Sequence, residues 1–388
     1  MKQGWEYKRF DEVFNLQMGK TPDRKNLDYF GGKNVWISIR DLGDKEVSES
    51  NEHITDKAVS DTNIRKVKKG TVIMSFKLTV GKCGIAAKDL YTNEAIMAFN
   101  TKEGYDINSS FLYYYLQCYN WKGSNKAVMG ITLNKATISK HHINIPPKST
   151  QLTIVSELDK INELIRLKKE QLKDYDNLAQ SIFYEMFGDP VENEKGWEVK
   201  KLEENVEEMF LGPFGSALKV DSYVSKEESY CMVYEQKHAI KKTIDLENHY
   251  ISKEKFDGLK RFSVKPGDFI MSCRGTIGKL FEIPNDAPLG IIHPSLMKIR
   301  LKKDGYNPTF FQFMLVKIVA NESTNGNCVQ MAITAKALGK KKLPLPPLPL
   351  QHLFAQRIEQ IEHQKSEVTK AITDLETLLA SRMQHWFE

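Results

Sequence analysis

The sequence predicts an α+β protein made of two tandem mixed α/β domains, each followed by a long helix. We expect the two helices to pack as an antiparallel coiled coil, which gives the molecule pseudo-twofold symmetry. Three observations support this fold class. The chain repeats itself at an offset of about 200 residues, each copy ends in a long heptad-patterned segment, and the segments before the heptads lack regular βαβ alternation.

The repeat is clearest where the two long helices begin. Gln151 aligns with Gln351, and the apolar positions that follow each glutamine match along the two heptad segments. Further upstream the register shifts by a few residues, as loop insertions would cause, so that residues 74–82 recur as residues 271–279. A tandem duplication of a domain plus a helix suits a target that has two parts.

Length and composition indicate a soluble globular protein. The 388 residues allow two or three domains, and the hydrophobic content of 41% is ordinary. No stretch of about 18 apolar residues exists and the N-terminus lacks a signal peptide's apolar run, so we expect no membrane contact and a cytoplasmic location. Five scattered cysteines without a CxxC pair indicate free thiols in a reducing compartment: Cys83, Cys118, Cys231, Cys273 and Cys328.

The charge gives a weak bias toward polyanions. The net charge is +6 and the isoelectric point is near 8.7. The basic residues form short runs inside the globular parts, a pattern that is also typical of ordinary solvated faces. The runs are residues 65–69, 241–242, 302–303 and 340–342.

The two domains are predicted to span residues 1–148 and 190–348. Both contain short apolar segments broken by Gly, Asn, Asp and Pro, which is typical of strands and turns. In the first domain we expect strands at residues 35–39 and 70–76 and a helix at residues 110–119. In the second domain we expect strands at residues 264–273 and 296–301 and a helix at residues 308–319, before a proline-stiffened segment at residues 343–349.

The first long helix is predicted over residues 149–189. Ser149 or Thr150 can cap its start, and Gly188-Asp189-Pro190 ends it. Roughly 38 residues at ~1.5 Å each make a rod of about 57 Å. Lys168 interrupts an otherwise apolar seam, which comprises Ile154, Leu158, Ile161, Ile165, Leu172, Tyr175, Ala179 and Ile182.

The second long helix is predicted over residues 349–388. Lys365 interrupts its seam, which comprises Phe354, Ile358, Ile361, Val368, Ile372, Leu375 and Leu379. Because one helix cannot bury such a seam alone, we expect the two helices to pair, mainly through Ile154, Leu158, Ile161 and Leu172 on the first and Phe354, Ile358, Ile361 and Ile372 on the second. The alternative is that each helix packs on its own domain.

The motifs that would mark an enzyme are absent from the sequence. Gly19-Lys20-Thr21 resembles the end of a phosphate-binding loop, but Phe14 stands where the first glycine is required. Gly278-Lys279 is not followed by Ser or Thr, and His141-His142 lacks the spacing of a zinc-binding helix. We therefore predict a chain that catalyses nothing by itself and holds no metal.

The ordered set of motifs resembles the specificity subunit of type I restriction–modification enzymes. The resemblance covers essentially the whole chain. Its carriers are Gly19-Lys20-Thr21-Pro22, the segment 212–219, the segment 274–279, and the two helix entries Ile145-Pro146-Pro147…Gln151 and Leu345-Pro346-Pro347…Gln351.

The resemblance implies that residues 1–148 and 190–348 are target-recognition domains, each reading half of a split double-stranded DNA site. The helical regions 149–189 and 349–388 would act as a ruler between them and as the dock for two modification methyltransferase subunits. This chain would hold no cofactor. S-adenosylmethionine would belong to the modification subunits, and ATP and Mg²⁺ to restriction motor-nuclease subunits.

Lys and Arg beside glycine turns can approach a DNA backbone closely, and polar side chains can read base edges. The predicted DNA-binding residues are Lys20, Thr21, Arg24, Lys77, Lys82 and Asn125 in the first domain, and Lys219, Arg274, Lys279 and Gln330 in the second. Alternatively, Thr79, Gly81, Thr276 and Gly278 only shape hairpins. The first copy has Leu78 where the second has Gly275, and we expect this difference to change the turn. Tyr113, Tyr114 and Tyr115 are predicted to be core residues.

Two other functions fit parts of the sequence. A coiled-coil scaffold that joins two protein partners would explain the seams and the mild charge without any DNA reading. An autonomous restriction or modification enzyme would require catalytic motifs that the sequence lacks.

Overall fold

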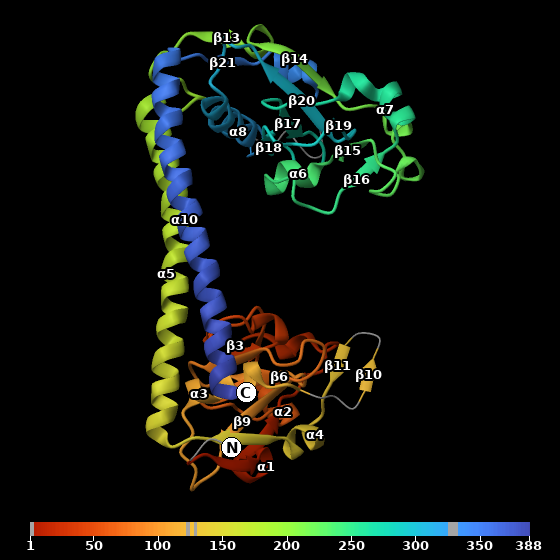
Figure 1. The fold of residues 1–388 in the computed structure, drawn as a ribbon. Helices are drawn as coiled ribbons and strands as arrows, with labels where there is room; N and C mark the ends of the chain where they lie inside the picture. Colours follow the sequence, from red (N-terminus) through yellow and green to blue (C-terminus); the bar gives the residue numbers. More distant parts are fainter. Residues whose placement is uncertain (1–3, 122–124, 128–129, 325–332) are drawn as a thin grey trace. The chain divides into compact units, whose positions relative to one another are not determined.

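The computed structural model describes residues 4–121, 125–127, 130–324 and 333–388. The chain forms two compact units, of which unit 1 comprises Met1–Lys169 and Lys370–Glu388 and unit 2 comprises Glu170–Thr369. Both boundaries fall inside long helices, α5 (Lys148–Phe187) and α10 (Leu348–Phe387), which are drawn in yellow-green and blue in Figure 1. Each unit therefore combines a domain, the first part of the helix that follows it and the last part of the other helix.

Unit 1 contains two main sheets and two strand pairs. The five-stranded sheet has the order β2 (Phe14–Met18), β9 (Ile96–Thr101), β6 (Val72–Ser75), β7 (Cys83–Ala86) and β4 (Glu46–Val47). The three-stranded sheet has the order β5 (His53–Ile54), β3 (Phe30–Ile37) and β8 (Tyr91–Thr92). The remaining strands pair as β1 (Glu6–Arg9) with β12 (His142–Ile145) and β10 (Asn125–Ala127) with β11 (Gly130–Thr132). The helices are α1 (Phe10–Val13), η1 (Leu27–Tyr29), η2 (Ile39–Asp41), α2 (Asp56–Thr62), α3 (Ser109–Cys118) and α4 (Lys135–Lys140).

Unit 2 repeats this plan. One sheet has the order β14 (Val206–Leu211), β20 (Leu296–Leu301), β17 (Phe269–Ser272) and β18 (Leu280–Glu282), and the other has the order β16 (His249–Ile251), β15 (Cys231–Tyr234) and β19 (Gly290–Ile292). β13 (Val199–Lys201) pairs with β21 (Lys342–Pro344). The helices are η3 (Leu202–Glu204), η4 (Gly215–Ala217), η5 (Val220–Ser222), α6 (Gln236–Lys241), α7 (Lys253–Leu259), η6 (Lys260–Phe262), α8 (Pro308–Thr324) and α9 (Ala335–Gly339).

The strand registers show that the two units are copies. In unit 1, Phe99 of β9 faces Leu16 of β2 and Val72 of β6. In unit 2, Ile299 of β20 takes the same place between β14 and β17. The duplication that the sequence predicts is therefore confirmed, with β2, β9 and β6 matching β14, β20 and β17.

The end of α10 completes the core of unit 1. Phe387 packs against Phe111 and Tyr115 of α3, with ring centroids 5.8 Å and 5.7 Å apart. Tyr113, Tyr114 and Tyr115 are buried in the same cluster, as predicted.

The end of α5 plays the same part in unit 2. Phe187 lies 4.6 Å from Phe310 of α8 and 5.4 Å from Phe354 of α10, measured between ring centroids. Each unit therefore receives an aromatic residue from the end of the helix that begins in the other unit.

The two helices pack antiparallel in each unit, which confirms the predicted fold class. In unit 1, Glu157 of α5 binds Arg382 of α10, and Lys169 lies 2.8 Å from Glu376. In unit 2, the rings of Phe183 and Phe354 are 5.6 Å apart. The seam residues Ile154, Leu158, Ile161, Phe354, Ile358, Ile361 and Ile372 are buried and Leu172 is half-buried.

The seam also packs on the domains, as the alternative proposed. Ile154 and Leu158 belong to the core of unit 1, together with Leu379 and Met383 from α10. Lys365, which interrupts the apolar seam of α10, forms an ion pair with Asp176 of α5, with 2.8 Å between Nζ and Oδ1.

Several element limits differ from those predicted. β3 begins five residues earlier than the predicted strand and ends at Ile37, because Ser38 starts a capping box with Asp41. β17 is shorter than predicted, since Gly267 takes φ +83° and turns the chain before it. α8 continues to Thr324 instead of ending at Val319. Among the described residues, no helix combines the length and apolar character that crossing a membrane requires.

Candidate nucleic-acid interface

Two exposed turns are built alike in the two units. In unit 1 the turn joins β6 to β7, where Ser75 N donates to Lys82 O at 2.8 Å and Gly81 N donates to Ser75 O at 3.0 Å. In unit 2 the turn joins β17 to β18, and the matching bonds between Ser272, Gly278 and Lys279 are both 2.9 Å.

A buried serine side chain closes each turn. Ser75 Oγ accepts from Lys82 N at 3.1 Å and donates to Thr79 O. Ser272 Oγ accepts from Lys279 N at 2.9 Å and donates to Thr276 O at 2.5 Å. Gly81 and Gly278 take φ +88° and +79°, so these glycines do shape the turns.

The tip of each turn is left-handed. Gly275 takes φ +65° and Leu78 takes φ +61°. The expectation that leucine changes the turn is therefore wrong, since the hydrogen bonds of the serine impose the same backbone on both residues. A left-handed conformation costs a residue with a Cβ roughly 1–2 kcal/mol, and Leu78 carries this strain whereas Gly275 does not.

The turn of unit 1 borders a hollow of about 630 Å³. The hollow is lined by Arg24, Ser38, Ile39, Arg40, Lys77, Leu78, Thr79, Asn93, Glu94 and Ala95. The capping box at the start of η2 fixes its wall, because Asp41 accepts from the Ser38 backbone N at 2.7 Å and from Asn51 N at 2.9 Å. Burial alone would raise the pKa of Asp41, but these hydrogen bonds hold the pKa below its ordinary value.

The hollow is lined by one cation that forms a salt bridge, Arg24, and by two that form none in the described part of the chain, Arg40 and Lys77. Arg24 forms a double hydrogen bond with Glu52, at 2.6 Å and 3.0 Å, which raises the pKa of the guanidinium. Its guanidinium also lies 5.0 Å from the ring centroid of Phe30. Arg40 and Lys77 have no salt-bridge partner among the described residues, which leaves their charge available to an anionic ligand.

The structure brings only some of the predicted residues of unit 1 to this hollow. Arg24 and Lys77 line it, and the Thr21 hydroxyl donates to Glu94 at its edge. Lys20 does not line it, since its Nζ donates to Thr62 O at 2.6 Å. Lys82 is exposed where the turn returns to β7. The backbone of Asn125 lies in β10, and its side chain lies outside what the structure describes.

Unit 2 closes the corresponding place. Gln236 occupies the position of Ile39, and its Nε2 donates to Arg274 O at 2.7 Å and to Thr276 O at 3.2 Å. The side chain thus joins the start of α6 to the turn between β17 and β18. Arg274, Lys279 and Lys219 are exposed, and Gln330 lies outside the described residues.

A histidine cluster adjoins Arg274 in unit 2. His249 stacks on Tyr223 with ring centroids 4.5 Å apart and lies 3.0 Å from Glu235. Burial lowers the pKa of His293, whereas the carboxylate of Glu235 raises it and the guanidinium of Arg274 lowers it. Sequence reasoning missed these histidines, together with Arg40 and Gln236. The capping boxes that follow Ile37 and Tyr234 could have located Arg40 and Gln236, which lie inside them.

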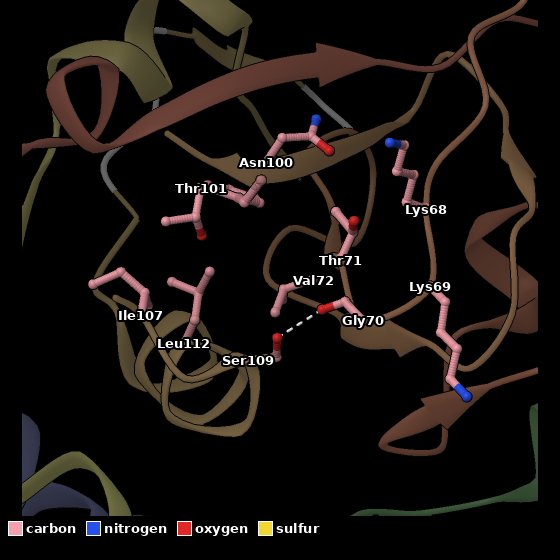
Figure 2. A pocket seen from close by; sticks show the side chains of 11 residues that line it. Lys68, Lys69, Gly70, Thr71, Val72, Asn100, Thr101, Ile107, Ser109 and Leu112 are labelled. Carbon is pink, nitrogen blue, oxygen red and sulfur yellow. Dashed lines mark hydrogen bonds between the residues drawn. The ribbon is translucent and has the colours of Figure 1, made fainter. Parts of the chain in front are cut away.

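A second depression, of about 560 Å³, lies at the opposite end of β6 (Figure 2). Its walls include Lys68, Lys69, Thr71 and Asn100, and Ser109 donates to Gly70 O at 2.6 Å. The strand registers place Asp268 and Arg300 of unit 2 at the positions of Thr71 and Asn100.

The same place is filled in unit 2. Arg300 binds Asp268 with two hydrogen bonds of 2.6 Å and 2.7 Å, so an ion pair stands where unit 1 has a depression. The two copies therefore differ in the side-chain contacts at this end of the strand, whereas the turn at the other end is built alike. Within the described residues no group of three His, Cys, Asp or Glu side chains could hold a metal ion.

Comparisons with known proteins agree with this architecture. The family model of the type I restriction modification DNA specificity domain matches residues 2–174 and 194–377. The type I restriction enzyme MjaIX specificity subunit of Methanocaldococcus jannaschii is 29% identical over 240 residues, which are 56% of this chain and 52% of that protein. The HindI specificity subunit of Haemophilus influenzae is 20% identical over 203 residues, 52% of this chain and 40% of that protein. The chain thus spans about half the length of these curated relatives or less.

A solved structure concerning complex assembly and conformational transition of the type I R-M system shows the same fold. It aligns with 100% of this chain and 98% of its own, with a TM-score of 0.67 and 17% identity. Both halves of the chain, each with its turn and its long helix, are therefore accounted for by one family description. The chain belongs to the type I restriction modification DNA specificity domain family and contains that domain twice.

Proposed function

We propose that the chain is a non-catalytic specificity subunit that reads a bipartite double-stranded DNA site, one half with each unit. One observation carries this proposal: both units present the same serine-closed turn at the end of equivalent strands, with a basic residue, Lys77 or Arg274, directly before its tip. A repeated cationic projection suits a repeated polyanionic target.

The residues that line the hollow of unit 1 suggest separate contacts to DNA phosphates and to base edges. Arg40 and Lys77 would contact phosphates, because both line the hollow and neither forms a salt bridge within the described residues. Ser38, Thr79 and Asn93 also line the hollow and offer donors and acceptors that can pair with base edges. Phosphate contacts would fix the position of the unit and base-edge contacts would give its specificity.

The helices would dock two modification methyltransferase subunits, which bring S-adenosylmethionine. Restriction motor-nuclease subunits with ATP and Mg²⁺ would complete the enzyme. Leu178 and Leu378 support this proposal, because they stand at equivalent positions of α5 and α10 and are each 46% exposed. If they belong to docking surfaces, Leu178→Asp and Leu378→Asp should each reduce co-purification with the modification subunit, whereas Lys173→Asp on the exposed face of α5 should not.

DNA recognition is tested by selecting duplexes from a randomised library with the full chain. We expect an enriched sequence in two blocks and an affinity that falls steeply with salt. Arg40→Ala and Lys77→Ala should each weaken binding roughly tenfold and reduce the salt slope by about one ion. Lys68→Ala and Lys69→Ala, at the opposite end of β6, are the matched controls and should leave binding unchanged.

Equal binding of random and selected duplexes would refute the proposed function. A chain that captures protein partners but protects no DNA from footprinting reagents would instead be a coiled-coil scaffold. If the Lys68 and Lys69 variants weaken binding more than the Arg40 and Lys77 variants do, the DNA binds at the depression in Figure 2 instead.

A further inference from the structure

We propose that Leu78 is a specificity-determining residue that contacts the C5-methyl group of a thymine in the half-site read by unit 1. The inference rests on the proposed function and assigns a chemical partner to one side chain of the site. Neither the repeat nor the family description distinguishes Leu78 from other turn residues.

The backbone of Leu78 is the first argument. The residue is held at φ +61° while 64% of its surface is exposed, so no core packing compensates the strain. The fold does not need leucine here, because Gly275 forms the same turn with the same hydrogen bonds in unit 2. Strained residues that the fold does not need are concentrated at ligand-binding sites.

The surroundings of Leu78 give the class of ligand. Lys77 precedes it in the turn, and Arg40 lines the same hollow. Two cations at one hollow beside an exposed tip suit the phosphates that border a DNA groove. The apolar tip would then enter the groove, and the only apolar group that base pairs present in the major groove is the thymine methyl.

The second unit supplies an internal comparison. At the matching positions it has Arg274 and Gly275, so its tip has no side chain and its neighbour is a guanidinium. Arginine pairs with guanine O6 and N7, which contain no methyl group. Methyl dependence is therefore expected in only one of the two half-sites.

The test replaces each thymine of the selected duplex, one at a time, by deoxyuridine, which keeps the hydrogen-bonding edge and lacks the methyl. The full chain should lose about three- to tenfold in affinity at one position of one half-site, as expected for one buried methyl group. Leu78→Gly keeps the turn, should bind the thymine duplex more weakly by the same factor, and should no longer distinguish thymine from deoxyuridine at that position.

Arg40→Ala is the matched control. It should weaken binding to the thymine and deoxyuridine duplexes equally and keep their ratio. Thermal unfolding of Leu78→Gly at a temperature equal to or above that of the parent chain shows that the variant is folded.

Three results would overturn the inference while leaving the proposed function intact. The first is a Leu78→Gly variant that distinguishes thymine from deoxyuridine as well as the parent chain does, and the second is a selected sequence in which no thymine is sensitive to methyl removal. A uniform loss for Leu78→Gly with both duplexes would also overturn it, since the side chain would then act as a wedge. Failure to select any sequence would instead refute the proposed function itself.

Discussion

Two buried glutamines hold the long helices to their domains. Gln151 is 1% exposed; its Oε1 accepts from Asn108 N at 2.8 Å and its Nε2 donates to Pro146 O at 3.0 Å. Gln351 makes the same pair of bonds with Asn307 N at 2.8 Å and Pro346 O at 2.7 Å. An amide can be buried at little cost only if it is hydrogen-bonded. Each glutamine therefore fixes one loop to the start of its helix through these bonds.

Replacing either glutamine with alanine should lower the free energy of unfolding by about 1–3 kcal/mol, because a backbone donor and an acceptor lose their buried partner. Urea unfolding of the full chain measures this effect. Trp5, Trp36, Trp121 and Trp386 lie in unit 1 and only Trp197 lies in unit 2, so fluorescence reports mainly Gln151→Ala. Circular dichroism follows Gln351→Ala, with Lys173→Ala as the surface control. A loss below about 0.5 kcal/mol would contradict this role.

The ion pair that replaces the Figure 2 depression in unit 2 is a second residue-scale difference. Asp268 is 1% exposed and is bound by Arg300, and Lys298 lies 3.6 Å away. Removing one partner of a buried pair leaves an uncompensated charge. Asp268→Asn should therefore destabilise unit 2 by about 3–5 kcal/mol, measured by urea unfolding. A triple variant with Asp268→Thr, Lys298→Ala and Arg300→Asn carries the residues that unit 1 has at these positions. It should recover part of the lost stability. No recovery would show that the three charges do not depend on one another.

Not every role of a residue could be predicted from the sequence. The alignment of Gln151 with Gln351 marks the repeat, but the Asn108 and Asn307 backbone N–H groups that they bind lie 43 and 44 positions earlier and are placed by the fold. Lys20 was predicted to contact DNA because it follows a glycine, yet the fold brings Thr62 O to its Nζ. The backbone of Leu78 could not be predicted, because leucine disfavours the conformation that the turn imposes.

At the scale of elements, the helices do more than pair. The heptad pattern correctly predicts both seams, because the 3.5-residue period is local in the sequence. The same pattern does not show that Phe187 and Phe387, at the helix ends, enter domain cores. These contacts depend on the tertiary fold, which brings Phe387 to the core of unit 1 and Phe187 to the core of unit 2.

The end of α10 in unit 1 is held by a carboxylate. Glu157 accepts from Arg382 Nη2 at 3.2 Å and from Trp386 Nε1 at 2.9 Å. Both bonds lower the pKa of Glu157, and the bond from Arg382 has the larger effect. A carboxylate with a lowered pKa stabilises the fold above its unfolded pKa of about 4.3, and this stability is lost as the pH falls through the folded pKa.

Glu157→Gln should therefore cost about 1 kcal/mol at pH 7, since the carboxylate is partly exposed. The difference from the parent chain should shrink as the pH falls below the unfolded pKa of about 4.3 and be lost as the pH falls through the lower folded pKa. Urea unfolding followed by tryptophan fluorescence at each pH measures it. Glu163→Gln is the control, because the Glu163 carboxylate binds Arg166 of the same helix. A difference that is independent of pH would show that the charge of Glu157 is not involved.

At the scale of the molecule, the duplication conserves the framework and varies the turn tips. The sequence predicts the order of elements well, since strands, loops and helices recur in both copies. It does not predict that unit 1 has an open hollow where Gln236 closes unit 2, because that difference depends on one side chain reaching a neighbouring turn. Two similar frameworks with different tips suit a target whose halves differ in sequence.

The length of α5 and α10 should determine the spacing of the two half-sites, because each helix begins in one unit and ends in the other. Inserting one heptad after Ile165 and one after Leu375 preserves both seams and adds ~10.5 Å, about three base-pair steps of ~3.4 Å. Selection from a library with variable spacers should then yield a spacer about three base pairs longer with unchanged half-sites. Seven residues inserted after Glu194, in the loop that follows α5, should leave the spacer as it was, and a heptad in α5 alone should abolish binding by breaking the helix pair. An unchanged spacer after the double insertion would refute the ruler, because the half-sites would then be positioned by something other than the paired helices.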